Sequence, residues 1–180
     1  MTDEEKTMLF FDDFLKGIGL DYMVFASTLL GIIRGGELLP GDKEIDFCVH
    51  GADLTDEMMG RLQASGHYGV MYPCHEKYGE FYLSDMKSIA PSEPHVAMNP
   101  LWKKNGVVYQ NIHNDECMLW DPKYYPKETW STIKYLGREF KAPSNPKAWL
   151  KYWYGSDWKT PLSGTWHDNK NLRLYKDLWV

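Results

Sequence analysis

Apolar side chains near the start of the chain recur at helical intervals. The first run consists of Met8, Phe11, Leu15 and Ile18. Spacings of three and four residues place such side chains on one face of an amphipathic helix. Thr2 and Glu5 have the spacing of a capping box, and Gly17 and Gly19 are expected to stop the segment. We therefore predict an opening helix that packs one face against a core.

The next segment predicts a strand that leads directly into a second helix. Residues 22–25 form a short apolar run, as in a buried strand. Ser27 and Thr28 then carry hydroxyl groups suited to cap a helix, and the apolar residues that follow end at Gly35 and Gly36.

Two more helices are predicted further along. One begins at Asp53 and is closed by the serine and glycine at residues 65–66. In the other, Asn145 and Pro146 have the character of a cap and a first helical position, and Gly155 that of a C-terminal stop. The side chains expected to face inward in this last helix are Trp149, Leu150 and Trp153.

Strands are predicted where apolar and polar residues alternate. Between residues 45 and 50 this alternation places Asp46 and Cys48 on one face. Further strand-like segments lie at about residues 67–72, 79–84, 94–98 and 106–112. Asn105-Gly106 is a turn signal that predicts a hairpin between the last two. The mixture predicts an α+β fold, and because no linker or repeat interrupts residues 1–180 we interpret them as a single domain.

Composition narrows the classes of function. With 43% hydrophobic residues, the 180-residue chain has enough apolar material for a core. A formal net charge of −5 supplies no broad basic field for nucleic acid. Three irregularly spaced cysteines fit reduced thiols, and no apolar run reaches the ~20 residues of a membrane span. We expect a cytoplasmic protein with no nucleic-acid partner and no membrane span.

Two adjacent features suggest phosphate chemistry. A helix that starts near Ser27 and Thr28 offers free backbone N–H groups and hydroxyls to an anion. Glu44 and Asp46, two residues apart on a strand, project to the same side, where they can share a hard divalent cation. Asp46 stands among apolar neighbours, where a charge is costly unless it is paired or ligated.

The same stretch resembles the signature of the LicD and fukutin-related family. The matching residues read Ser-Thr-Leu-Leu-Gly-x-x-Arg at 27–34 and Pro-x-Asp-x-Glu-Ile-Asp at 40–46. Residues 94–100 resemble the family's His-Val-Asp strand, and residues 149–155 resemble its closing helix that ends in Tyr-Gly. The likeness spans about residues 22–161.

The resemblance implies a nucleotidyltransferase-like core, a mixed β-sheet flanked by helices, and an enzyme that uses Mg²⁺ or Mn²⁺. The implied reaction moves a phospho-alcohol group, such as phosphocholine or phosphoribitol, from a CDP-linked donor to a hydroxyl of a glycan or glycoconjugate. Carried over, Glu44 and Asp46 bind the metal and Asp42 assists them. The residues expected to bind the nucleotide and its phosphates are Ser27, Thr28, Gly31 and Arg34. For Arg34, a salt bridge that holds the loop is an equally good interpretation.

Several positions depart from the family pattern. Ser27 replaces a glycine, Gly41 a tryptophan, and Glu44 an aspartate, which is a mild change because glutamate ligates the same ions. The serious departure is Ala97, which stands at the catalytic position of the third carboxylate and places activity in question. Three explanations remain open: an engineered inactive variant, a natural pseudoenzyme, or replacement of the lost group by another acid such as Glu80 or Asp85.

Two alternative functions also remain open. A non-catalytic carbohydrate- or choline-binding module would use the aromatic residues of the C-terminal part, with Trp158 and Trp166 as candidates for ligand contact. A nucleotidyltransferase with another acceptor, such as tRNA or an antibiotic, shares the same motif, although the acidic charge disfavours tRNA.

Overall fold

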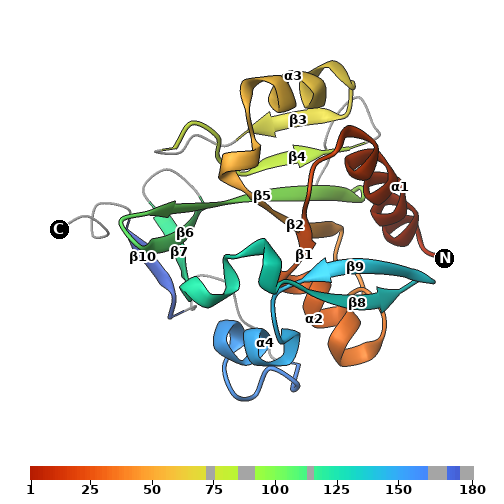
Figure 1. The fold of residues 1–180 in the computed structure, drawn as a ribbon. Coiled ribbons are helices and arrows are strands. Elements are labelled where there is room, and N and C mark those ends of the chain that lie inside the picture. Colours follow the sequence, from red (N-terminus) through yellow and green to blue (C-terminus); the bar gives the residue numbers. More distant parts are fainter. Residues whose placement is uncertain (72–75, 85–91, 113–115, 162–169, 175–180) are drawn as a thin grey trace.

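The structure, a computed structural model, describes residues 1–71, 76–84, 92–112, 116–161 and 170–174 (Figure 1). Its α-helices are α1 (Asp3–Ile18), α2 (Ala26–Gly35), α3 (Asp56–Ala64) and α4 (Pro146–Tyr154). The strands of the main sheet are β1 (Met23–Val24), β2 (Glu44–His50), β3 (Tyr68–Met71), β4 (Phe81–Leu83), β5 (His95–Lys104), β6 (Val107–Asn111), β7 (Glu116–Trp120) and β10 (Leu172–Leu174). A separate two-stranded sheet consists of β8 (Ser131–Tyr135) and β9 (Arg138–Ala142). Short 3₁₀ helices lie at Gly51–Asp53, Pro122–Tyr124 and Lys127–Thr129.

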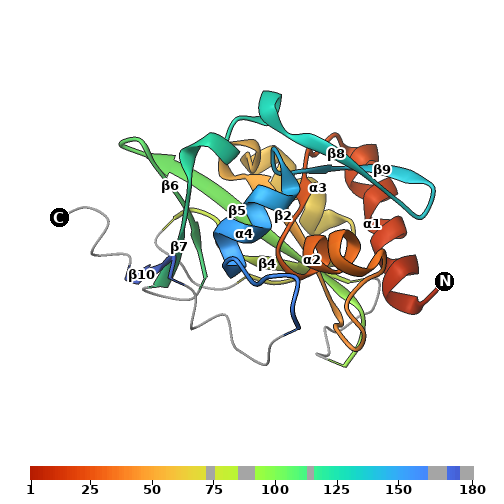
Figure 2. The same cartoon turned by 90° about the horizontal axis from the view of Figure 1, so that it is seen from below.

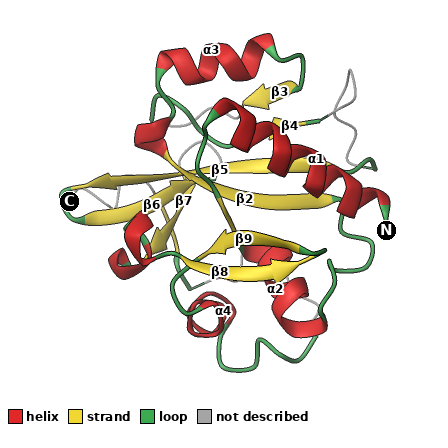
Figure 3. Ribbon diagram, turned by 45° about the vertical axis from the view of Figure 1, so that its right-hand side comes forward, coloured by secondary structure: helices red, strands yellow, loops and turns green. Residues whose placement is uncertain are grey.

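The main sheet is mixed and is centred on β2 and β5. Its strands follow the order β1-β2-β5-β6-β7-β10, and β4 joins β5 while carrying β3. The β2–β5 pair is parallel, whereas the other pairs are antiparallel. Figures 1 and 3 show α2 and α4 grouped on one side of β2 and β5 and α1 and α3 on the other. The predicted α+β fold with a mixed sheet flanked by helices is confirmed.

Local signals account for the two helices that lie furthest apart in the sequence. The Thr2 side chain accepts from the backbone of Glu5 and the Glu5 side chain accepts from that of Thr2, so the predicted capping box forms. Gly19 ends α1 in the left-handed region at φ 77°. At the start of α4, the Asn145 side chain accepts a hydrogen bond from the backbone N–H of Ala148, as expected of an N-cap.

The core fills both sides of the sheet. The inward face of α1 is fully buried at Met8, Phe11 and Leu15. On the α4 side, the rings of Trp149 and Trp153 stack at 4.9 Å between centroids, and Trp120 packs against both. The predicted inward residues of α4 are therefore core residues. Within the part of the chain that the structure describes, no helix is long and apolar enough to cross a membrane.

Several elements differ from the predictions. The helix predicted from Asp53 begins later, at Asp56, after a 3₁₀ turn. Strand β5 runs to Lys104, well past the predicted 94–98, because its second half pairs with β6 around the Asn105-Gly106 turn. The β8–β9 hairpin was not predicted. Its turn places Leu136 and Gly137 at φ 49° and 74°, and leucine is not a residue that signals such a turn.

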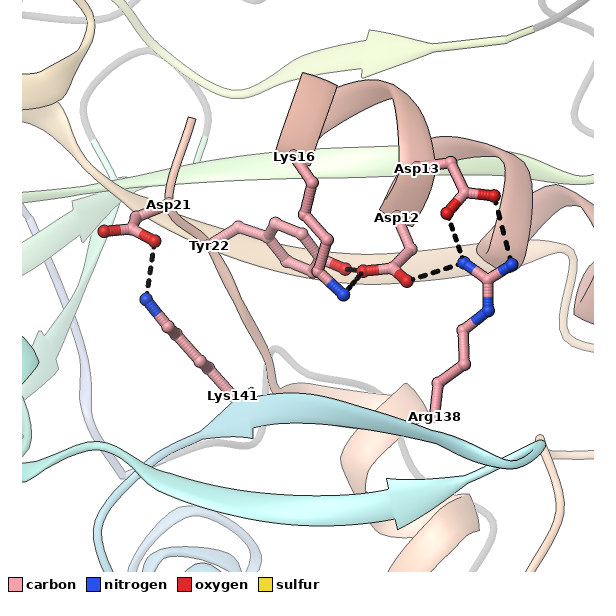
Figure 4. A network of polar contacts seen from close by, with 7 residues as sticks. All are labelled: Asp12, Asp13, Lys16, Asp21, Tyr22, Arg138 and Lys141. Atoms are coloured by element: carbon pink, nitrogen blue, oxygen red, sulfur yellow. Dashed lines mark hydrogen bonds and ion pairs between the residues drawn. The ribbon is translucent and has the colours of Figure 1, made fainter. Parts of the chain in front are cut away.

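A buried network of polar contacts joins α1 to β9 (Figure 4). The carboxylate of Asp12 is fully buried, and it accepts a hydrogen bond from the Tyr22 hydroxyl at 2.5 Å. Lys16 lies 2.6 Å and Arg138 2.9 Å from the same carboxylate. Arg138 also binds both oxygens of Asp13, which fixes the guanidinium between the two acids. The network therefore anchors the small sheet to the opening helix.

We expect Arg138→Met to lower the free energy of unfolding by about 2 kcal/mol or more, because it takes one cation from a buried carboxylate. Urea unfolding followed by circular dichroism at 25 °C measures the change. Lys134→Met is the matched control, since Lys134 is exposed and its ion pair with Glu139 is long, at 3.9 Å. That control should change stability by less than about 1 kcal/mol, and equal losses in both variants would contradict the anchoring role.

Candidate active site

The first turn of α2 is clamped onto β2 through Asp46. The backbone N–H and the hydroxyl of Ser27 lie 3.0 and 2.7 Å from the Asp46 Oδ2 atom. In the opposite direction, the backbone N–H of Asp46 donates to the Thr28 hydroxyl oxygen at 2.8 Å. Asp46 is only 7% exposed, so these contacts satisfy a carboxylate that is largely removed from water.

These contacts change the interpretation of Ser27 and Thr28. The predicted capping role is wrong, because the N-cap of α2 is Phe25 and no side chain caps the helix. The Ser27 hydroxyl is engaged by Asp46 and also by Asp42, at 2.6 Å. Tertiary contacts with β2 and its preceding loop therefore take the hydroxyls that the sequence pattern assigned to the helix.

Three carboxylates gather at the start of β2. Asp42 accepts a hydrogen bond from the backbone N–H of Glu44 at 3.1 Å, which fixes the loop that leads into the strand. Burial raises the pKa of Asp46 well above its usual range, and the charges of Glu44 and Asp42 raise it further. The Ser27 hydroxyl carries one hydrogen but lies within hydrogen-bond distance of both aspartates, so one of these contacts needs a proton on a carboxyl group.

The predicted metal ligands form a two-carboxylate set. Glu44 and Asp46 share one face of β2, and their mutual repulsion is of the kind that a divalent cation relieves. Across the described ranges, no three His, Cys, Asp or Glu side chains come together as a metal-binding group. Mg²⁺ commonly binds through one or two carboxylates plus substrate phosphates and water, so the pair fits a cation that arrives with a nucleotide.

Strand β5 brings Ala97 beside Asp46. The parallel register pairs Asp46 with Ala97 and Glu44 with His95, so the methyl group of Ala97 lies in the row where the resemblance implied a third carboxylate. On its other edge, Ala97 pairs with Tyr82 of β4. Ala97 is fully buried in this row.

His95 borders the site at the end of the same face. Its Nε2 atom lies 3.6 Å from the Glu44 carboxylate, and its Nδ1 atom lies 2.8 Å from the carbonyl oxygen of Glu93. The hydrogen bond with Glu44 raises the pKa of His95 above its usual value. His95 is therefore placed as a partner of Glu44.

Of the two acids suggested as replacements for the lost carboxylate, Glu80 lies in the described structure and Asp85 lies outside the described residues. Glu80 is 7% exposed and accepts a hydrogen bond from the Tyr82 hydroxyl at 3.2 Å. Burial, followed by the charge of Glu44, raises the pKa of Glu80 to about 8. Glu80 thus lies within the electrostatic field of the carboxylates on β2.

The remaining residues predicted to bind phosphate have different surroundings. A Cβ atom at Gly31 would lie 2.6 Å from the carbonyl oxygen of Glu37 and 2.9 Å from the backbone nitrogen of Leu39. Gly31 therefore allows α2 to pack closely against that loop. Arg34 is partly exposed and forms no ion pair with an acid among the residues described, so its guanidinium group is available to an anion.

Tyr154, the tyrosine of the Tyr-Gly pair that closes the family-like helix, was not predicted as a site residue but lies near the carboxylates. It lies at the end of α4, and α4 packs against α2. Burial raises the pKa of the Tyr154 hydroxyl, the charges of Asp46 and Asp42 raise it further, and Arg34 lowers it. These electrostatic contacts place the phenol near the carboxylates and Arg34, although 38% of the side-chain surface remains exposed.

The aromatic residues of the C-terminal part belong mainly to the core. Trp158, a predicted ligand contact, is 8% exposed and packs with the core cluster. Trp166 lies outside the described residues. Among the aromatic side chains of α4, Tyr154 is therefore the one that reaches the carboxylates and keeps substantial exposure.

Comparisons with known proteins agree with this geometry. The family model for the LicD/FKTN/FKRP nucleotidyltransferase domain matches residues 19–145. The lincomycin-bound crystal structure of the lincosamide antibiotic adenylyltransferase LnuA aligns with a TM-score of 0.51 and 15% sequence identity, over 81% of this chain and 84% of that chain. At this identity the likeness shows a shared fold, that of a nucleotidyltransferase. A search of curated protein sequences finds no match.

We expect Gly31→Ala to lower the free energy of unfolding by about 2 kcal/mol, because the new methyl group meets backbone atoms that cannot turn away. Gly60→Ala in α3 is the control, since nothing lies within 4 Å of the added Cβ. That change should stabilise the protein by about 0.5 kcal/mol or more through helix propensity. Urea unfolding of both variants compares them directly, and a neutral Gly31→Ala would show that the loop has room to yield.

The raised pKa of Glu80 also predicts a pH dependence. The folded protein holds this proton more tightly than the unfolded chain, so the stabilisation is full below pH 4.5 and is lost as pH rises toward about 8. Between pH 5 and pH 8.5, the free energy of unfolding of Glu80→Gln should therefore rise by at least about 1 kcal/mol relative to that of the wild type. Urea unfolding at both pH values tests this, with exposed Glu139→Gln as the control that should show no such gain.

Proposed function

The chain belongs to the LicD/FKTN/FKRP nucleotidyltransferase-domain family, and from this premise we propose that it moves a phospho-alcohol group, of the phosphocholine or phosphoribitol type, from a CDP-activated donor to a hydroxyl of a glycan. The family and the fold assign the chain to the transferases in general. The observation that supports the finer proposal is the pair Glu44 and Asp46, held by β2 directly against the start of α2.

The carboxylate pair has the character of a site for a cation that comes with phosphate. Glu44 and Asp46 would hold Mg²⁺ or Mn²⁺, which supplies positive charge to the phosphates of the donor. Asp46 is oriented by Ser27 and Thr28, and Asp42 orients Ser27 and the backbone of Glu44. Ser27 and Thr28 therefore act in this proposal by positioning the metal-binding group.

Arg34 and Tyr154 are placed to contact the donor. The guanidinium group of Arg34 has no acidic partner among the described residues. The charges of Arg34, Asp46 and Asp42 all act on the Tyr154 hydroxyl, so these groups lie around the same site. A guanidinium group binds phosphate oxygens well because it presents several N–H donors in one plane. We assign Arg34 to the donor phosphates, and Tyr154 to the side of the site formed by α4.

The second candidate function is a non-catalytic carbohydrate- or choline-binding module. It is favoured by one observation, the methyl group of Ala97 in the row where the resemblance implied a third carboxylate. Such a module would bind a sugar or choline without a divalent cation. The two candidates therefore differ in their dependence on metal.

We expect CDP and CMP to bind only in the presence of Mn²⁺ or Mg²⁺, and Asp46→Asn to abolish that binding because it removes a charged ligand of the cation. Isothermal titration calorimetry with and without Mn²⁺ measures both effects. Asp53→Asn is the control: it removes a half-buried acid that pairs with Lys127 just beyond the C-terminal end of β2, whereas Glu44 lies at the start of the strand, and it should leave the nucleotide affinity within about twofold.

The opposite pattern would favour the binding module. Choline or a sugar that binds equally well with and without Mn²⁺, in a protein that binds neither CDP nor CMP, would overturn the transferase proposal. Binding of ATP or GTP in preference to CDP, with the same dependence on Asp46, would keep the metal site and reject the cytidine donor.

A further inference from the structure

The row of side chains across the centre of the sheet has a methyl group, at Ala97, where the resemblance implied a third carboxylate. Asp46, Ala97 and Tyr82 lie side by side on β2, β5 and β4. A methyl group neither ligates a cation nor accepts a proton. Any catalytic activity therefore requires another base within reach of this row.

Glu80 lies beside the row, at the residue directly before β4. Tyr82, two residues further along, belongs to the row because it pairs with Ala97. The Tyr82 hydroxyl donates to the Glu80 Oε1 atom at 3.2 Å, so Glu80 is tied to the residue that is paired with Ala97. Glu80 as a residue is only 7% exposed.

No cationic partner among the described residues explains the presence of an acid at this buried position. Among the described residues, no lysine or arginine pairs with Glu80, and the charges that act on it are those of Glu44 and His95. A buried carboxyl group without a cation destabilises the fold when it is ionised. Such groups are found preferentially at functional sites, where their chemistry offsets that disadvantage.

We propose that Glu80 supplies the carboxylate that Ala97 lacks, so that the third acidic group of this active site comes from the residue directly before β4 instead of from β5 and accepts the proton of the acceptor hydroxyl. The proposal rests on the proposed transferase function and deepens it. It also selects one of the three explanations for Ala97, namely that another acid has taken over the role.

The step balances with groups already assigned. The oxygen of the acceptor hydroxyl attacks the phosphorus that carries the alcohol, and a new P–O bond forms. Its proton passes to the Glu80 carboxylate, which becomes a carboxylic acid. The P–O bond to the cytidine monophosphate group breaks, and CMP leaves with the electron pair as an additional negative charge on its phosphate. Glu80 then returns the proton to solvent.

His95 is less suited to this role than Glu80. Its Nε2 atom faces the Glu44 carboxylate, and its Nδ1 atom lies 2.8 Å from the carbonyl oxygen of Glu93, so both ring nitrogen atoms already have an acceptor group beside them. The Glu80 carboxyl group, in contrast, receives a hydrogen bond from the Tyr82 hydroxyl, a contact that favours its ionised form.

The first test measures CMP release from CDP-choline and CDP-ribitol with Mn²⁺, using water as the acceptor so that the natural glycan need not be known. Glu80→Gln keeps the size of the side chain and removes the base. We expect CMP release to fall by about 100-fold or more, while the dissociation constant of CDP measured by calorimetry stays within about twofold. Exposed Glu139→Gln is the control for loss of one negative charge and should match the wild type.

The second test restores a carboxylate on β5. In the Glu80→Gln background, Ala97→Asp should raise CMP release at least about tenfold, because the new acid lies in the same row. Ala97→Asn in that background has nearly the same shape without the charge, and it should recover nothing. Circular dichroism of each variant verifies that the fold is kept.

A third measurement does not depend on turnover. In protein labelled with ¹³C at the glutamate carboxyl groups, NMR follows the titration of Glu80, which is assigned by its absence from Glu80→Gln. If the two positions serve one site, Ala97→Asp should raise the pKa of Glu80 through repulsion between neighbouring carboxylates, and Ala97→Asn should leave it nearly unchanged.

The outcomes distinguish failure of the role of Glu80 from failure of the transferase function. A wild-type protein that binds CDP with Mn²⁺ and releases CMP, together with a fully active Glu80→Gln variant, would overturn the role of Glu80 and leave the transferase function standing. A Glu80 pKa that Ala97→Asp does not move would also overturn it. A wild-type protein that neither binds CDP nor releases CMP would overturn the transferase function, and the role of Glu80 with it.

Discussion

The clamp between Asp46 and the first turn of α2 is the interaction on which the rest of the site depends. A carboxylate that is almost fully buried in a strand must be satisfied by donors, and Ser27 supplies two of them. A further hydrogen bond, from the backbone N–H of Asp46 to the Thr28 hydroxyl oxygen, joins the same strand and helix. The clamp sets where α2 begins, and α2 in turn packs against α4 and so determines where Tyr154 lies.

The site concentrates negative charge at one end of β2. Glu44 and Asp42 repel Asp46, and the charge of Glu44 also acts on Glu80, which adds a fourth carboxyl group to the same field. Such an arrangement is unfavourable for stability, since buried like charges hold protons that an exposed carboxyl group would release. Binding of a cation together with donor phosphate would relieve the repulsion, so the same groups that lower stability would favour the ligand.

The sheet explains how an acid can change strands without a change in fold. Strand β5 lies between β2 and β4, so a side chain on either of its edges can reach the row that contains Ala97. Figure 2 shows α1 beside β8 and β9, where the buried network around Asp12 and Arg138 holds this helix to the small sheet (Figure 4). Scaffold and site therefore rely on separate sets of charges, which allows the site to vary while the fold persists.

The sequence by itself determined the features that depend on neighbouring residues. The Thr2 and Glu5 box, the Asn145 cap and the Asn105-Gly106 turn are visible because their partners lie within a few positions along the chain. The family motif likewise marked Glu44, Asp46 and the missing acid at Ala97. Only the tertiary structure decided that Ser27 binds Asp46 instead of capping its helix, that Gly31 is a packing residue, and that the charges of the carboxylates on β2 act on Tyr154 and Glu80. These contacts cross between elements, and their geometry follows from sheet register and helix packing, which no local pattern encodes.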